Sequence, residues 1–178
     1  INTSKNLGGD VENPFVIYDD VAELYAKINA ELKEIVAKRQ AIEKQCAAEN
    51  PEKAAKMAEW FSGKAPNIDW SNLVQKPNSP TRVASAACLG VLSEQVKNMI
   101  VSSADLCNSD RTDGFLKDTH NITRGDFSGA FFQAGVSELT MACMCIGMYL
   151  HGGIIPACGT FFVFSDYMKP AIRMAALM

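Results

Sequence analysis

Three short segments in the second half of the chain carry side chains that could do chemistry. The first holds the carboxylate Asp105, the second holds Glu138, and the third holds aromatic rings three residues apart at Phe161, Phe164 and Tyr167. A carboxylate can hold a proton, and an aromatic ring offers a face and an edge to a flat ligand. Together these groups could shape one pocket.

Each of these residues also has an ordinary structural interpretation. Glu138 could interact favourably with the dipole of the helix that it begins, and Asp105 could be a turn residue. The three aromatic residues could be core side chains on one helix face. Arg82, at a predicted helix start, could be a solvated surface cation. Spacing alone leaves both sets of interpretations open.

The segments that must position these residues alternate between strand and helix patterns. Short apolar runs predict strands at 99–103, 130–133 and 154–157, and longer patterns predict helices at 81–96, 137–150 and 161–178. A polar stretch at 107–128 predicts a loop. This alternation indicates a parallel α/β sheet, whose ligands bind at the carboxyl ends of the strands. Function is therefore expected in the loops after residues 103, 133 and 157.

The first 80 residues have a different texture. Residues 1–18 predict an irregular lead-in, after which Asp19 or Asp20 can cap a long helix with an apolar stripe. Asn50-Pro51 ends that helix and starts a shorter one. Three prolines between residues 64 and 80 predict a linker. We therefore expect a lead-in and helical connector at 1–80 and a separate domain at 81–178.

Composition excludes several classes of protein. The chain has 178 residues, of which 48% are hydrophobic, and its net charge is −3. That balance argues against a basic nucleic-acid binder and against intrinsic disorder. The apolar runs are shorter than the roughly 20 residues that a membrane-spanning helix needs. We therefore expect neither a nucleic-acid nor a membrane partner.

The six cysteines predict a reducing compartment. They lack any Cys-x-x-Cys spacing, and several stand within apolar runs. This pattern favours buried thiols over a disulfide framework. The expected location is the cytoplasm.

Six motifs occur in an order that resembles the transketolase family. They are Thr81-Arg82-x-Ala84-Ser85, Ser103-Ala104-Asp105-Leu106, Gly135-Val136-x-Glu138, His151-Gly152-Gly153, Thr160-Phe161-x-x-Phe164-x-x-Tyr167 and Arg173-Met174-Ala175-Ala176-Leu177. The resemblance covers residues 81–178 strongly, while residues 7–14 and the long helices look like the interdomain connector of the family. It implies an incomplete parallel-sheet pyrimidine-binding domain of a thiamine-diphosphate enzyme, preceded by a long helical connector.

The resemblance also implies an activity. Transketolases transfer a two-carbon ketol unit from a ketose phosphate to an aldose phosphate, using thiamine diphosphate and a divalent metal such as Mg²⁺. That activity belongs to carbohydrate metabolism in the pentose phosphate pathway. In the family, the second subunit of a homodimer completes each active site, so the implied partners are sugar phosphates and a second subunit.

On the cofactor side, the resemblance assigns five residues. Glu138 aligns with the family glutamate that contacts N1′ of the aminopyrimidine ring, where a proton is shared. Phe161, Phe164 and Tyr167 match the aromatic side chains that enclose this ring. Asp105 matches an acid near the cofactor at the end of a strand.

On the substrate side, Arg82 and Ser109 match positions that bind the substrate phosphate, and an arginine fork suits phosphate oxygens. Two departures stand out. Many family members have Arg where this chain has Ser137, and many have Asn where it has Asp110. A carboxylate at position 110 would repel phosphate unless it points away.

Both ends of the chain predict a piece of a longer protein, because Ile1 opens it and a run of helix-forming residues ends it at Met178. The family's metal and diphosphate ligands are expected before Ile1, in the diphosphate-binding domain, so this chain should bind no metal and be inactive alone. The alternatives are a fragment of a deoxyxylulose-phosphate synthase or of a dihydroxyacetone synthase, or a natural pyrimidine-side subunit of a split transketolase.

Overall fold

The computed structural model describes residues 2–178, which form two compact units that are treated separately. The first unit, up to Ala54, contains α1 (Asn2–Asn6) and α2 (Asp19–Glu49). The prediction of an entirely irregular lead-in is wrong, because α1 forms within it. The N-cap prediction is also wrong. Tyr18 occupies that position without a side-chain bond, while Asp19 and Asp20 lie in the first turn, where their charges favour the helix dipole.

The apolar stripe of α2 is exposed over its whole length. Its members include Leu24, Ile28, Leu32 and Ile35, and the helix buries none of its residues. The periodicity therefore predicts the helix correctly but does not identify core residues. Helix α3 (Pro51–Phe61) follows directly. The side chain of Asn50 donates to the carbonyl of Cys46, so it serves the end of α2.

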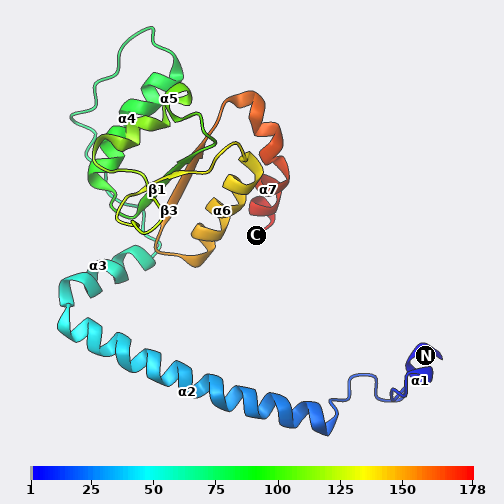
Figure 1. Ribbon diagram of the computed structural model, residues 1–178. Helices are drawn as coiled ribbons and strands as arrows, with labels where there is room; N and C mark the ends of the chain where they lie inside the picture. Colours follow the sequence, from blue (N-terminus) through cyan, green and yellow to red (C-terminus); the bar gives the residue numbers. More distant parts are fainter. Residues whose placement is uncertain (1) are drawn as a thin grey trace. The chain divides into compact units, whose positions relative to one another are not determined.

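The second unit, Ala55–Met178, is built on a three-stranded parallel sheet. Its strands are β1 (Met99–Ser103), β2 (Phe131–Gln133) and β3 (Ile155–Gly159), in the order β2-β1-β3 (Figure 1). Ser103 is in register with both Gln133 and Gly159, so the three carboxyl ends are flush. The prediction of a parallel α/β sheet is confirmed.

Helices cover both faces of this sheet. Helix α4 (Thr81–Gln95) lies on one side, and α6 (Glu138–His151) and α7 (Ser165–Leu177) lie on the other (Figure 1). A 3₁₀ turn, η2 (Phe162–Phe164), precedes α7. The helix predicted from residue 161 is therefore a 3₁₀ turn followed by an α-helix.

The stretch at 107–128, predicted to be a loop, contains two short helices. They are α5 (Cys107–Asp110) and the 3₁₀ helix η1 (Thr112–Lys117). Phe115 in η1 is only 1% exposed and belongs to the core. Burial of this ring orders a backbone that its polar neighbours would otherwise leave in a loop. The loop prediction is therefore wrong for 107–117.

The core lies between the sheet and the α4–η1 layer. Its buried cluster comprises Val96, Met99, Val101, Phe115 and Phe131, with Leu89, Leu92 and Ile155 among the residues packed around it. β1 is central and buried on both faces, as the continuous apolar run Met99-Ile100-Val101 predicts. This core fixes the strand ends on which the candidate site stands.

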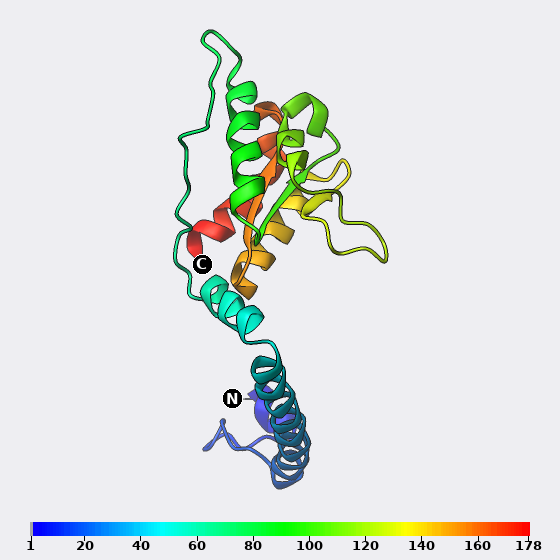
Figure 2. The same cartoon turned by 90° about the vertical axis from the view of Figure 1, so that its left-hand side faces the viewer.

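The proline-rich segment at 64–80 is held along α4 without forming a helix or strand (Figure 2). Gln95 accepts a bond from the backbone nitrogen of Asp69 and donates one to its carbonyl. Further along, Gln75 donates to the carbonyl of Ala84. Two glutamine side chains thus attach the segment to the helix.

The cysteine prediction needs a correction. All six are free thiols, but Cys46 and Cys143 are exposed and the other four are only partly buried. A chain of this size exposes a large surface, 13290 Å², and leaves its apolar runs half covered, so an apolar setting does not imply burial. Over residues 2–178, no helix combines the length and the apolar character that crossing a membrane requires.

Candidate active site at the carboxyl edge of the sheet

Glu138 lies at the first position of α6, just beyond the end of β2. It is 7% exposed, and its Oε1 accepts one long hydrogen bond, 3.4 Å, from Oγ1 of Thr160. A buried carboxyl with one weak partner retains lone pairs for a ligand. Its place at a helix N-terminus adds a favourable dipole interaction, so the ordinary interpretation is correct, while a role toward a cofactor stays a prediction.

A pocket of about 530 Å³ opens beside Glu138. Phe164 and Tyr167 line one part of it, and the rest is mostly apolar, from Ala104, Leu106, Val136 and Leu139. Ser137 and Thr140 add polar groups beside Glu138, and a mostly apolar pocket with a few polar groups is typical of small-molecule sites. It suits a flat heteroaromatic ring that exchanges a proton with a carboxyl.

The three predicted aromatic residues form a continuous row. The ring centroids of Phe161 and Phe164 are 6.4 Å apart, as are those of Phe164 and Tyr167, whose planes differ by 22°. Only the last two line the Glu138 pocket, whereas Phe161 lines a different one. The sequence therefore predicts the row, but not its division between two pockets.

Asp105 stands in the turn after β1, between two residues of the Glu138 pocket, Ala104 and Leu106. Its backbone is left-handed, with φ of 63°, and its side chain is exposed. Aspartate tolerates this conformation better than most residues. The turn interpretation is thus correct, and a role toward a cofactor stays a prediction.

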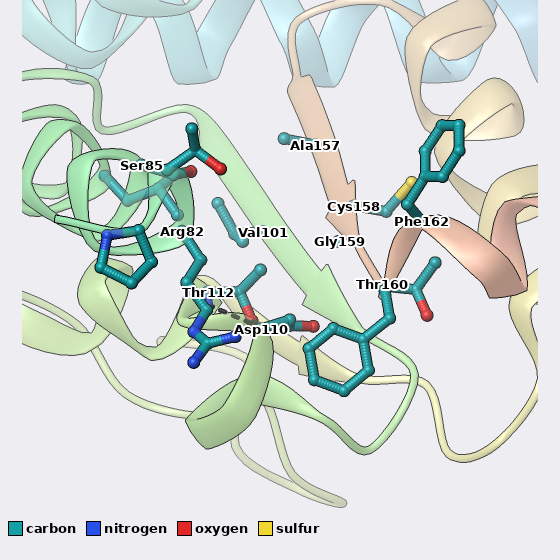
Figure 3. A pocket seen from close by; sticks show the side chains of 14 residues that line it. Arg82, Ser85, Val101, Asp110, Thr112, Ala157, Cys158, Gly159, Thr160 and Phe162 are labelled. Carbon is teal, nitrogen blue, oxygen red and sulfur yellow. Dashed lines mark hydrogen bonds between the residues drawn. The ribbon is translucent and has the colours of Figure 1, made fainter. Parts of the chain in front are cut away.

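A second pocket, of about 560 Å³, lies on the α4 side of the same edge (Figure 3). Arg82, Thr81 and Ser85 line it from the first turns of α4, and Phe161 and Phe162 line it from the segment just after β3. Thr160 belongs to this pocket while its hydroxyl bonds to Glu138. Arg82 makes no ion pair within residues 2–178, so its guanidinium is available to an anion.

Ser109 is exposed on α5, one residue before Asp110, which lines the Arg82 pocket. The carboxylate of Asp110 is tied down locally. Oδ2 accepts from Ser103 Oγ at 2.9 Å, and Oδ1 accepts from the backbone nitrogen and the Oγ1 of Thr112, at 2.9 and 2.8 Å. The expectation that this carboxylate must point away from the site is therefore only partly met.

Glycine at position 159 makes room for this arrangement. A Cβ atom there would stand 2.3 Å from Cγ2 of Thr112 and 3.6 Å from Oδ2 of Asp110. Thr112 and Thr160 are the site residues that the sequence-based argument missed. Thr160 opens one of the six motifs but was given no role there, and Thr112 belongs to none of them.

The His151-Gly152-Gly153 motif has a structural role. Both glycines have positive φ, and a Cβ at Gly153 would lie 2.7 Å from Cε2 of Phe61. The ring of His151 lies 6.0 Å from that of Phe61. Within residues 2–178, no group of three or more His, Cys, Asp or Glu side chains could hold a metal ion.

The comparisons with known proteins agree with this architecture. The family model described as transketolase, pyrimidine binding domain, matches residues 78–178, more than half of the chain. The chain is 34% identical to a transketolase of Halalkalibacterium halodurans over 175 residues, 94% of this chain and 25% of that protein. It is 40% identical to a transketolase of Bacillus subtilis over 132 residues, 72% of this chain and 19% of that protein.

Solved structures give the same result. A transketolase from Leishmania mexicana matches with a TM-score of 0.81 and 28% identity, over 99% of this chain and 26% of that one. A Pichia stipitis transketolase in complex with sedoheptulose 7-phosphate matches with a TM-score of 0.80 and 26% identity, over 98% and 27%. The chain thus spans about a quarter of the length of these relatives.

Fold and site together define an α/β pyrimidine-binding domain, in part, with its ligand edge at the carboxyl ends of β1, β2 and β3. The chain belongs to the transketolase family. The alternatives, a deoxyxylulose-phosphate synthase, a dihydroxyacetone synthase or a split subunit, are not favoured over it.

Proposed function

We propose that the protein carrying this chain transfers a two-carbon ketol unit between sugar phosphates, with thiamine diphosphate and Mg²⁺. In this proposal the chain supplies the pyrimidine side of the cofactor site. The observation that carries it is Glu138, a buried carboxyl with one weak protein partner in an aromatic pocket.

The residues of the Glu138 pocket fit an aminopyrimidine ring. When bound, thiamine diphosphate would supply the carbanion chemistry that cleaves and forms carbon–carbon bonds beside a carbonyl. Glu138 would share a proton with N1′ of the ring, and burial would keep water from competing for that bond. Phe164 and Tyr167 would hold the ring faces, and Phe161 would continue the wall toward the substrate.

The Arg82 pocket would take the phosphate end of the substrate. Arg82 is unpaired within residues 2–178, and Thr81, Ser85 and Thr160 add hydroxyl groups around it. A planar guanidinium bonds phosphate oxygens in a bidentate manner. Ser109 would extend this site from α5, and Asp105 would stand near the cofactor at the end of β1.

The wider assignments follow from the same proposal. Mg²⁺ and the diphosphate would be bound outside residues 2–178, by the diphosphate-binding domain that the resemblance implies. A second subunit of a homodimer would complete the site. We also propose the cytoplasm and the pentose phosphate pathway as its setting, since six free thiols favour a reducing compartment.

The test is a ketol-transfer assay of the whole protein, expressed from its own gene, with thiamine diphosphate and Mg²⁺. Glu138→Gln keeps the shape of the side chain but removes the shared proton, so ketol transfer should fall by at least about 100-fold. Glu94→Gln is the matched control, because Glu94 pairs with Lys117 on the surface. Full activity of Glu138→Gln would overturn the proposal.

The second experiment is a calorimetric titration of the 178-residue chain alone with thiamine diphosphate and Mg²⁺. Without diphosphate and metal contacts it should bind the cofactor too weakly to detect. Tight binding by the isolated chain that Glu138→Ala abolishes would support the role of Glu138 but refute the division of the site. Tight binding that Glu138→Ala leaves unchanged would refute the assignment of Glu138 to the cofactor site.

A further inference from the structure

The pocket around Arg82 contains a carboxylate that an anion site should not tolerate. Asp110 lines this pocket together with Arg82, Thr112 and Thr160, and Figure 3 shows it between Arg82 and the end of β3. No ion pair links Asp110 to Arg82. The carboxylate therefore needs another explanation than neutralising the arginine.

Local donors hold this carboxylate in one orientation. Thr112 donates twice to Oδ1, through its backbone nitrogen and its hydroxyl, and Ser103 donates once to Oδ2. Ser103 is itself fully buried, and its hydroxyl accepts a bond from the backbone nitrogen of Leu106. Both donors are therefore fixed, so the Asp110 carboxylate cannot rotate freely.

A carboxylate accepts about four hydrogen bonds, two at each oxygen. Three of these positions are used, both on Oδ1 and one on Oδ2. The fourth, on Oδ2, has no partner among residues 2–178 and belongs to a side chain that lines the pocket. The pocket thus offers a cation and an open carboxylate acceptor position to the same ligand.

We propose that Asp110 is a specificity-determining residue that accepts a hydroxyl hydrogen from the ligand whose phosphate group Arg82 binds. The ligand class is a phosphate monoester that also carries hydroxyl groups, and bare phosphate is disfavoured. This inference rests on the proposed function, because it needs the Arg82 pocket to hold the substrate phosphate.

The electrostatics of the pocket support this selection. A negative charge beside Arg82 weakens the attraction of the site for any anion. A hydroxyl donor to a carboxylate makes a charge-assisted hydrogen bond, which is stronger than one between neutral groups. Only a ligand with both groups recovers what the carboxylate costs in phosphate binding.

Asp110→Asn changes the open hydrogen-bonding position of the pocket from an acceptor to a donor and keeps the shape of the side chain. The two donors of Thr112 select the amide oxygen for the Oδ1 position, so the amide nitrogen takes the place of Oδ2. The open position then donates instead of accepting. A phosphate oxygen gains a partner there, and a hydroxyl hydrogen loses one.

The experiment measures dissociation constants of ribose 5-phosphate, ethyl phosphate and inorganic phosphate for the whole protein. Asp110→Asn should weaken the binding of ribose 5-phosphate about tenfold and tighten the binding of inorganic phosphate about threefold. A merely structural role would weaken all three ligands together. The proposal is overturned if the three constants change by the same factor or do not change.

Controls separate this inference from the proposed function. Asp118→Asn removes the same charge from an exposed carboxylate that pairs with Lys97, and should leave all three constants unchanged. If the wild type binds none of the phosphates, or binds them as well with Arg82→Leu, the proposed function fails instead. Should Asp110→Asn not fold, Asp110→Ser, which removes the carboxylate and with it the open acceptor position on Oδ2, replaces it in the same comparison.

Discussion

Thr160 donates a hydrogen bond from Oγ1 to Oε1 of Glu138 over 3.4 Å, although the two residues belong to different pockets. Thr160 follows β3 and lines the Arg82 pocket, whereas Glu138 begins α6 and lines the aromatic one. The two pockets therefore meet at this hydroxyl–carboxyl contact, as they also do at the neighbouring rings of Phe161 and Phe164. A change on the substrate side can reach the proposed proton-sharing group through this contact.

Replacing Thr160 with valine should weaken cofactor binding a few-fold. The valine keeps the shape of the side chain but leaves Glu138 without its hydrogen bond and less firmly oriented. The expected loss of binding free energy for the cofactor is about 1 kcal/mol or less, because the bond is long. Thr160→Ser retains the hydroxyl and is the matched control. Calorimetric titration with thiamine diphosphate checks this, and equal affinities for both variants would contradict it.

Replacing Arg82 with leucine should raise the KM for phosphorylated ketoses about 10- to 100-fold, with a smaller change in kcat. The reason is the loss of charge-assisted bonds to phosphate. Arg82→Lys should lie in between, because an ammonium lacks the planar fork. Steady-state kinetics with an unphosphorylated ketose such as erythrulose is the control, and a similar loss with that substrate would argue against a phosphate site.

Gly114→Ala should destabilise the protein by about 1–3 kcal/mol. A Cβ atom at Gly114 would stand 2.4 Å from the carbonyl oxygen of Ala86, so η1 would have to move away from α4. Gly147→Ala is the opposite case, because nothing lies within 4 Å of a Cβ there and the residue is inside α6. That variant should gain about 0.5–1 kcal/mol. Thermal unfolding of both variants tests the pair, and a neutral Gly114→Ala would contradict the structure.

Cys145 should be alkylated at lower pH than an ordinary cysteine. A hydrogen bond from Cys158 favours its thiolate and lowers the pKa of Cys145 to about 7, while donating that bond, together with burial, raises the pKa of Cys158. A lowered pKa means that the reactive thiolate is already half populated near neutral pH. Iodoacetamide labelling at Cys145, followed by mass spectrometry, should therefore rise through pH 7.

Cys158→Ala removes the donor and provides the control for that experiment. In this variant the pH at which labelling of Cys145 is half maximal should move upward, toward the pKa of about 8.5 of a free thiol. Labelling that rises at the same pH in the wild type and in this variant would show that the Cys158 contact does not act on Cys145.

Local sequence patterns predicted individual strands and helices, such as β1 and α2, but not how they are covered. The strand predicted at 99–103 coincides with β1, whose first three residues, Met99, Ile100 and Val101, are apolar, as expected of a central strand buried on both faces. Helix α2 was expected from its periodicity and is present, yet its stripe is exposed. Periodicity identifies the helix face that could pack, but it does not show whether other residues among 2–178 bury that face.

The site could be predicted only as a set of residues. Glu138, Phe164 and Tyr167 do line one pocket, but Phe161 lines another and Asp105 faces solvent. Whether neighbouring side chains share a cavity depends on turns such as the 3₁₀ segment η2, which local composition does not reveal. The role of Thr112 was missed for the same reason, since it depends on a left-handed Arg111 just before it.

The flush register of Ser103 with Gln133 and Gly159 restricts where the chain length can change. Inserting or deleting one residue inside β1 or β3 would shift a strand end and turn its side chains to the opposite face. The tip at 123–128 is exposed throughout and makes its hydrogen bonds mainly within itself and to His120. Length variation among relatives, and any peptide tag introduced by engineering, should therefore be tolerated at this tip and rejected along the strands.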